Sequence, residues 1–281
     1  MHNVLAFDTI SIKNAPSTEE KVRVAHEAGF PAVELRGNDI RDYTGSITEL
    51  HSIIEGLGLQ VVGFVPEADE YDWHYEAVDK VVARALETFK LCEALEVDTV
   101  VYPVMSTDSD IATTTRNFRV LCHAAAPFGL KIGLEFIGHV PKVQTLETAW
   151  HIVKNAEEPN GGIVLDLFHF YRGRSKLDGI RRIPPDKVYL VHVDDAMDKP
   201  IEELVGAKHR LYPGEGVIPV QEIITVLLET GYTNPFVVEL FNEDYWADSP
   251  TNVAERAKRT SQDIIALAIM GMRAQKIQVD D

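Results

Sequence analysis

Short apolar runs alternate with longer amphipathic segments along the whole chain, and this alternation predicts the fold. The runs are rich in Val, Ile, Leu and Phe, as buried strands are. They predict eight strands, at residues 4–10, 32–36, 60–65, 98–104, 131–137, 162–167, 187–195 and 236–241. The segments between them, such as 18–29, 74–96 and 220–231, carry apolar residues at helical spacing. The chain is therefore predicted to repeat a strand–helix unit.

Glycines mark the ends of several predicted helices. Gly29, Gly58, Gly129 and Gly231 each stand within a few residues before a predicted strand. Glycine is the usual residue just past the last turn of a helix, because it adopts the left-handed conformation without steric cost. No Ser/Gly-rich or Pro-rich linker divides the chain. We therefore expect a single domain over residues 1–281.

The number of strand–helix units predicts the architecture. Eight units fit the closed (β/α)8 TIM barrel, which typically needs about 250 residues. The alternative is an open doubly wound sheet, which usually has fewer strands and often a phosphate-binding glycine turn. No GxGxxG or GxxxxGKS/T motif follows the first predicted strand. The expected fold class is therefore α/β, with a single (β/α)8 TIM barrel.

Composition narrows the range of partners. The chain is 45% hydrophobic and 25% charged, with a formal net charge of -17. This acidity disfavours nucleic acid and anionic membrane surfaces as partners. Cys92 and Cys122 both fall in helix-like segments, so neither a disulfide framework nor a cysteine metal cluster is indicated. No leader-like start and no apolar window of about 20 residues is found. We expect a cytoplasmic protein and leave a homo-oligomer open.

Candidate chemistry is concentrated at the ends of the last four predicted strands. The catalytic groups of a TIM barrel come from the C-terminal ends of its strands and the loops after them. These ends carry Glu135, then Asp166 followed by His169, then His192 with Asp194 and Asp195, and finally Glu239 followed by Asn242. Two glutamates, an aspartate and an imidazole suit Mn²⁺, Mg²⁺, Co²⁺ or, less selectively, Zn²⁺. Without a cation, three converging carboxylates would repel one another.

Each of these residues also has a structural interpretation. A carboxylate at a strand end commonly caps a helix, forms a surface ion pair or anchors a loop. His192 lies between two valines and could be a hydrogen-bonded core histidine, and His169 could cap the next helix. The recurrence of such groups on four consecutive strands favours a divalent-metal site. Arg210, just before the Pro-Gly-Glu-Gly turn at 213–216, is either a cation for a substrate oxygen or a surface arginine.

Five motifs carry a resemblance to a known family. GLEFIG, VLDLFHF, VHVDDA, HRLYPGEG and VVELFN occur in this order, each at a predicted strand end or in the following loop. Together they resemble the xylose-isomerase-like TIM barrel superfamily of sugar isomerases, epimerases and keto-sugar dehydratases. The resemblance covers nearly the whole chain and is most specific over residues 131–246. It looks closest to the inosose dehydratase and sugar-phosphate isomerase/epimerase-like branch.

The resemblance implies a role for each candidate residue. The family binds one divalent metal, with Mn²⁺ the expected ion here, through residues that correspond to Glu135, Asp166, His192 and Glu239. In its ketose 3-epimerases the two glutamates also move the proton, and residues at the positions of His169 and Arg210 bind substrate oxygens. The extra histidines with which endonuclease IV relatives hold three zinc ions are not found, which disfavours DNA repair. Arg172 and Arg174 could meet an anion or be surface charges, so a phosphorylated substrate is left open.

The shared chemistry of the resembled family is removal of a proton next to a carbonyl, through a metal-stabilised enediolate. The first hypothesis is therefore a metal-dependent isomerase or epimerase of a sugar or keto-sugar. The alternative is a keto-sugar or cyclitol lyase of the inosose- or dehydroshikimate-dehydratase kind, including one that eliminates an aglycone from a 3-keto glycoside. A non-catalytic barrel subunit is a third hypothesis, which an intact four-ligand set disfavours.

Overall fold

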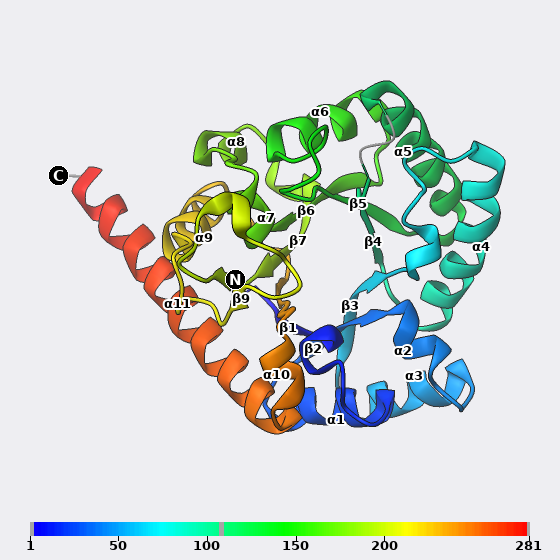
Figure 1. Cartoon of the computed structure of the whole chain (residues 1–281), viewed down its shortest axis with the longest axis horizontal. Coiled ribbons are helices and arrows are strands. Elements are labelled where there is room, and N and C mark those ends of the chain that lie inside the picture. The colour runs from blue at the N-terminus through cyan, green and yellow to red at the C-terminus, as the bar shows by residue number, and fades with distance from the viewer. Residues whose placement is uncertain (1–2, 107–109, 280–281) are drawn as a thin grey trace.

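Eight parallel strands close into a barrel, and helices surround it (Figure 1). The computed structural model describes residues 3–106 and 110–279. Neighbouring strands follow the order β1-β10-β7-β6-β5-β4-β3-β2 and then return to β1. The predicted α/β class and (β/α)8 barrel are confirmed. The single domain over 1–281 stays a prediction, and residues 1–2, 107–109 and 280–281 lie outside the described residues.

The elements have these bounds. The barrel strands are β1 Leu5–Asp8, β2 Ala32–Arg36, β3 Gln60–Val65, β4 Thr99–Pro103, β5 Lys131–Glu135, β6 Gly161–Asp166, β7 Val188–Val193 and β10 Phe236–Val238. A separate antiparallel pair consists of β8 Asp195–Ala196 and β9 Arg210–Leu211. The α-helices are α1 Thr18–Glu27, α2 Gly37–Arg41, α3 Ile47–Gly56, α4 Val78–Ala94, α5 Ile111–Ala125, α6 Leu146–Ala156, α7 Leu167–Arg172, α8 Leu177–Arg181, α9 Val220–Glu229, α10 Glu243–Ala247 and α11 Pro250–Val279. The 3-10 turns are η1 Thr9–Ile12, η2 Ala68–Glu70, η3 Ala126–Phe128, η4 Pro185–Lys187 and η5 Ile201–Glu203.

The barrel interior is layered, and the layering places the polar residues. One apolar cluster fills the interior and consists of Ala6, Ala32, Val65, Val101, Val164, Leu190 and Val237. Successive side chains of a strand point to opposite faces, so the residue two positions further on faces inward again. The residues two positions after members of this cluster include Asp8, Glu34, Asp166, His192 and Glu239. A charged layer therefore lies directly above the apolar one.

Glycines end the helices as the sequence predicts. Gly29, Gly58, Gly129 and Gly231 all have positive φ, between 69° and 92°. A residue with a β-carbon adopts this conformation only at a steric cost. These four positions therefore turn the chain from a helix into the following strand.

Several predicted strands are shorter in the structure, and the runs 236–241 and 187–195 each lose three residues. The run 236–241 ends as a strand at Val238, because the side chain of Ser11 replaces strand pairing there. Its Oγ accepts from the backbone N–H of Leu240 at 2.9 Å and donates to the carbonyl of Val238 at 3.3 Å. The run 187–195 breaks at Asp194, and Asp195 starts β8 instead.

The longest helix, α11, has no counterpart among the predicted elements. It packs along one side of the barrel against α9 and α1 (Figure 1). Within the part of the chain that the structure describes, no helix is both long and apolar enough to cross a membrane.

Candidate metal centre and substrate cavity

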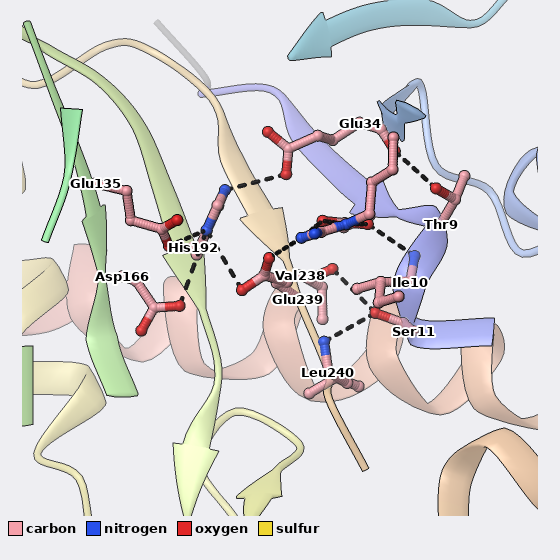
Figure 2. A network of polar contacts seen from close by, with 12 residues as sticks. Thr9, Ile10, Ser11, Glu34, Glu135, Asp166, His192, Val238, Glu239 and Leu240 are labelled. Carbon is pink, nitrogen blue, oxygen red and sulfur yellow. Dashed lines mark hydrogen bonds and ion pairs between the residues drawn. The ribbon is translucent and has the colours of Figure 1, made fainter. Parts of the chain in front are cut away.

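Four predicted ligands meet at one end of the barrel (Figure 2). Glu135 and Asp166 are the last residues of β5 and β6, His192 is the fifth residue of β7, and Glu239 directly follows β10. One ligand atom from each lies within 4.8 Å of those of the others, and all four residues are buried. The structure thus brings together the set that the sequence predicts, while their role as ligands stays a prediction.

His192 lies at the centre of this cluster. Its Nδ1 is 3.4 Å from Oε1 of Glu135, 3.5 Å from Oε2 of Glu239 and 3.8 Å from Oδ2 of Asp166. Burial lowers the pKa of His192, but the charges of Glu34 and Glu239 outweigh burial and raise that pKa well above its ordinary value. In the absence of a metal, the imidazole is therefore held as the cation that the carboxylates need.

The donor atoms fit a divalent cation. Among the described residues, Oε2 of Glu239 and both ring nitrogens of His192 are buried without a hydrogen-bond partner. Buried polar atoms normally find such partners, and an unsatisfied one costs free energy. A hard cation held by carboxylate oxygens and one imidazole would satisfy these atoms and offset the repulsion between the carboxylates. The cluster therefore suits a divalent metal.

Asp166 uses its two oxygens differently. Oδ1 accepts the backbone N–H of His169 at 2.7 Å and so caps α7. Oδ2 faces the cluster and the guanidinium of Arg210. The helix-cap interpretation and the ligand interpretation of this carboxylate are therefore compatible, because each concerns a different oxygen.

Arg210 is buried against the cluster rather than exposed on the surface. Its guanidinium pairs with Asp166 and Asp194, and its Nη1 lies 3.0 Å from Oε2 of Glu239. Asp194 also accepts the backbone N–H of Phe168 at 2.9 Å. Arg210 thus contacts two of the predicted ligands and lines the cavity at the same time.

Asp195 anchors the loop that carries Arg210. Its carboxylate accepts the backbone N–H groups of Ala196, Gly214, Gly216 and Ile218 at 2.8 to 3.1 Å. A β-carbon at Gly216 would lie 2.1 Å from the carbonyl oxygen of Ala196, so the turn requires glycine there. Asp195 is therefore a loop anchor, and it is not part of the metal cluster.

His169 faces the cavity as a neutral imidazole. Its Nε2 lies 3.4 Å from Nη2 of Arg210, and its buried Nδ1 has no hydrogen-bond partner in the described part of the chain. Burial and the charge of Arg210 lower the pKa of His169 to about 3. At neutral pH this ring can therefore donate or accept a hydrogen bond, but it is a weak base.

Three charged residues of the site were not predicted. Asp8 and Arg36 form a buried pair, with Nε of Arg36 3.0 Å from both carboxylate oxygens of Asp8. The guanidinium of Arg36 also pairs with Oε1 of Glu239. Glu34 lies against His192, on the side opposite the other ligands (Figure 2). The signal for Glu34 and Arg36 was present, because both are charged residues two apart at the end of an otherwise apolar strand.

A cavity of about 750 Å³ opens above the cluster. Glu135, Glu239, His169, Arg210 and Arg36 line it, together with residues of the loops after β1, β2 and β3. Asp166 and His192 are fully buried and are not among its lining residues. Next to the metal cluster, the lining thus presents Glu135, Glu239, Arg36, Arg210 and the neutral imidazole of His169 to a bound molecule.

Of four residues on or after β3 and β4, Glu67, Trp73, His74 and Tyr102, Glu67 alone lines this cavity. Glu67 lines it and lies 3.1 Å from Nη1 of Arg41. Trp73 and Tyr102 are buried, and they donate to the carbonyl of Pro103 and to the carboxylate of Glu70, each at 2.8 Å. His74 is fully buried as well. The side chains of Trp73 and Tyr102 are therefore engaged in packing and hydrogen bonds within the protein.

Comparison with known proteins identifies the family. Residues 22–264 match the family model for the xylose isomerase-like TIM barrel. The chain is 31% identical over 236 residues to a 3-dehydroshikimate dehydratase of Pseudomonas putida, covering 83% of this chain but only 37% of that protein. It is 30% identical over 255 residues to an inosose isomerase of Halalkalibacterium halodurans, covering 85% of this chain and 88% of that one.

A solved structure shows the same fold over nearly the whole chain. It is the structure of the IOLI protein with a zinc atom, with a TM-score of 0.84 and 24% identity over 94% of this chain and 98% of that one. The relatives named here are enzymes, an isomerase and a dehydratase. The family match and the closed barrel together show that the chain belongs to the xylose isomerase-like TIM barrel family.

Proposed function

We propose that the chain is a divalent-metal-dependent isomerase or epimerase of a sugar or keto-sugar, acting by proton abstraction next to a carbonyl. The observation that carries the proposal is the pair Glu135 and Glu239. Both line the cavity, both border the metal cluster, and they come from β5 and from just after β10, three strands apart in the barrel. The two carboxylates can thus approach a bound molecule from different sides.

The ligand set is Glu135, Asp166, His192 and Glu239, and the ion it suits best is Mn²⁺, with Mg²⁺, Co²⁺ or Zn²⁺ as alternatives. A bound ion would act as a Lewis acid, polarising the carbonyl and stabilising negative charge on oxygen. The structural neighbour contains a bound zinc atom, which supports a divalent metal in this chain.

Side chains of the protein would supply the charge stabilisation, the hydrogen bond and the proton transfer that the ion does not. Arg210 supplies a fixed positive charge for a substrate oxygen that becomes negative as the proton leaves. The neutral ring of His169 offers a hydrogen bond beside it. A carboxylate is a competent base once the carbon acid is activated in this way, and its proton can be returned to the same or a neighbouring carbon.

The two glutamates are not equivalent. Burial raises the pKa of Glu239, but the charges of His192, Arg210 and Arg36 outweigh it and hold that pKa well below the ordinary value. Among the described residues, no arginine or lysine pairs with the carboxylate of Glu135. We therefore assign proton abstraction to Glu135 and delivery or stabilisation to Glu239.

This asymmetry also supports a second candidate function. A keto-sugar or cyclitol lyase needs one base and an acid for the leaving group, and not two equivalent bases. The relative named 3-dehydroshikimate dehydratase belongs to this class, although the chain spans 37% of its length. We keep the lyase as the alternative, including elimination of an aglycone from a 3-keto glycoside. A small neutral or anionic carbonyl compound is the partner in either case.

Metal analysis followed by solvent exchange tests the proposal. The purified protein is expected to contain about one divalent ion per chain by mass spectrometry. In D₂O, a panel of keto-sugars and ketocyclitols is expected to yield a product with carbon-bound deuterium and an otherwise unchanged mass. Loss of water or of a larger group would indicate the lyase instead. A protein that binds none of the four metals, and that neither exchanges hydrogen with nor eliminates a group from any member of the panel, would contradict both functions and leave the non-catalytic barrel.

Replacing Arg210 or His169 separates substrate binding from metal binding. Arg210→Ala and His169→Ala are each expected to keep near-normal metal content, because neither supplies a ligand of the cluster. Loss of one charge-stabilising donor is expected to lower kcat/KM by about 100-fold. Metal content and steady-state kinetics measure the two effects. Arg174→Ala removes an exposed arginine just after α7 and is the control. An Arg210→Ala protein that binds no metal would contradict the assignment.

A further inference from the structure

Glu34 is a buried carboxylate that the proposed mechanism does not use. It lies on β2 with no exposed surface. Within the described residues, neither of its carboxylate oxygens has a hydrogen-bond partner. An unpaired charge in the interior costs several kcal/mol, so a carboxylate kept there needs a compensating contact.

The contact that Glu34 makes is with His192. Its Oε2 lies 3.0 Å from Nε2 of the imidazole, on the side of the ring that faces away from the other carboxylates (Figure 2). The guanidinium of Arg36, two residues further along β2, is paired with Asp8 and Glu239 instead. The charged contact of Glu34 is therefore with the imidazole of His192. Nδ1, on the opposite side of that ring, faces the predicted ligands.

The barrel leaves space for this arrangement. The pairing of β2 with β3 shifts by one residue between Val33 and Glu34, and the shift sets Glu34 beside Gly63. A β-carbon at Gly63 would lie 2.4 Å from Oε1 of Glu34. Any larger residue at this position of β3 would thus displace the carboxylate from its place beside His192.

We propose that Glu34 is a positioning residue for the metal site, a role that rests on the proposed metal-dependent function. With its Oε2 3.0 Å from Nε2 of His192, Glu34 favours the tautomer that carries its proton on Nε2 and leaves the lone pair of the ring on Nδ1. That lone pair points at Glu135, Asp166 and Glu239, where the ion would be held. A carboxylate behind a ligating histidine also increases the basicity of the ring and fixes its orientation. Glu34 thus acts on the ion through His192 and contacts neither the ion nor the substrate.

Metal affinity tests this role directly. Mn²⁺ and Zn²⁺ are titrated separately into the metal-free parent, Glu34→Leu and Glu34→Gln proteins, by calorimetry and chelator competition. Glu34→Leu removes the acceptor and is expected to weaken binding about 10- to 100-fold. Glu34→Gln keeps one acceptor oxygen and is expected to fall between Glu34→Leu and the parent. Glu70→Gln is the matched control, because Glu70 is a buried glutamate bonded to Thr88 and Tyr102. Its metal affinity is expected to equal that of the parent.

Stability of the metal-free proteins separates positioning from a purely structural role. Without an ion the site holds more carboxylates than cations, so metal-free Glu34→Leu is expected to unfold in urea at the same concentration as the parent or a higher one. A lower midpoint with unchanged metal affinity would overturn the positioning role. If Glu34→Leu does not fold, parent-like affinity in Glu34→Gln overturns it as well. A parent that binds neither ion would instead overturn the proposed function itself.

Discussion

His192→Ala is expected to lose bound metal and turnover together. The side chain provides the only imidazole of the four-residue cluster, and its Nδ1 lies within 3.8 Å of a carboxylate oxygen of each other member. Removing it leaves three carboxylates facing one another. They then lack the imidazole, which we expect to bind the ion when it is present and to supply a positive charge when it is absent. We expect metal affinity to fall by at least about 100-fold. Activity depends on several kcal/mol of charge stabilisation from the ion, so turnover is expected to fall by roughly 1000-fold.

Metal content and activity of His192→Ala are measured on the same preparation. His26→Ala, which removes an exposed histidine of α1, is the control for metal held by surface imidazoles. Urea unfolding of both variants shows whether His192→Ala is folded when it is assayed. Full metal occupancy with full activity in His192→Ala would remove this residue from the site.

The fold was predictable because strand and helix patterns alternate clearly. The eight predicted strands correspond one to one to the barrel strands, and most bounds differ by one or two residues. The larger differences arise where a side chain ends the strand pairing, as Ser11 does after Val238. Such an ending depends on a residue more than 200 positions away in the sequence, so local pattern does not reveal it.

The four predicted ligands were accessible to sequence reasoning because they recur at the same end of consecutive strands. For Glu34 the sequence offers a charged residue near the end of an otherwise apolar predicted strand, but it does not reveal the contact with His192. All five residues of β2 are buried, so burial does not distinguish the side chains that face into the barrel from those that face the helices. Its contact with His192 also crosses the barrel interior and depends on the shifted pairing with β3. A pattern within one strand contains none of this information.

The environment of Arg210 shows a similar limit. The sequence left open whether this arginine is a surface charge or a substrate contact. In the structure it is buried, because Asp195 folds the loop that carries it and Asp194 and Asp166 neutralise it. The burial that makes Arg210 useful to a substrate oxygen is thus created by three carboxylates, one at the end of β6 and two just after β7.

Glu135→Gln and Glu239→Gln are expected to keep their metal and lose turnover, in different ways. Glutamine preserves size and one oxygen that can face the ion, but it removes the basic site. Because only Glu239 is held by Arg36 and Arg210, we expect Glu135 to abstract the proton. Glu135→Gln should therefore lose exchange of the carbon-bound hydrogen with solvent and lose net turnover alike, each by about 100- to 10,000-fold.

The Glu239→Gln variant distinguishes the two proposed reactions. In an epimerase it should still exchange the substrate hydrogen on the face served by Glu135, while net inversion fails because the second face has no proton donor. In a lyase it should keep a measurable rate of elimination, since one base suffices. Glu70→Gln is the control, because Glu70 is bonded to Thr88 and Tyr102 and belongs neither to the cavity lining nor to the cluster. If both Glu135→Gln and Glu239→Gln keep metal and exchange at the parent rate, the two-glutamate mechanism is wrong. The base would then have to be sought elsewhere, and His169, with a pKa lowered to about 3, would be a poor substitute at neutral pH.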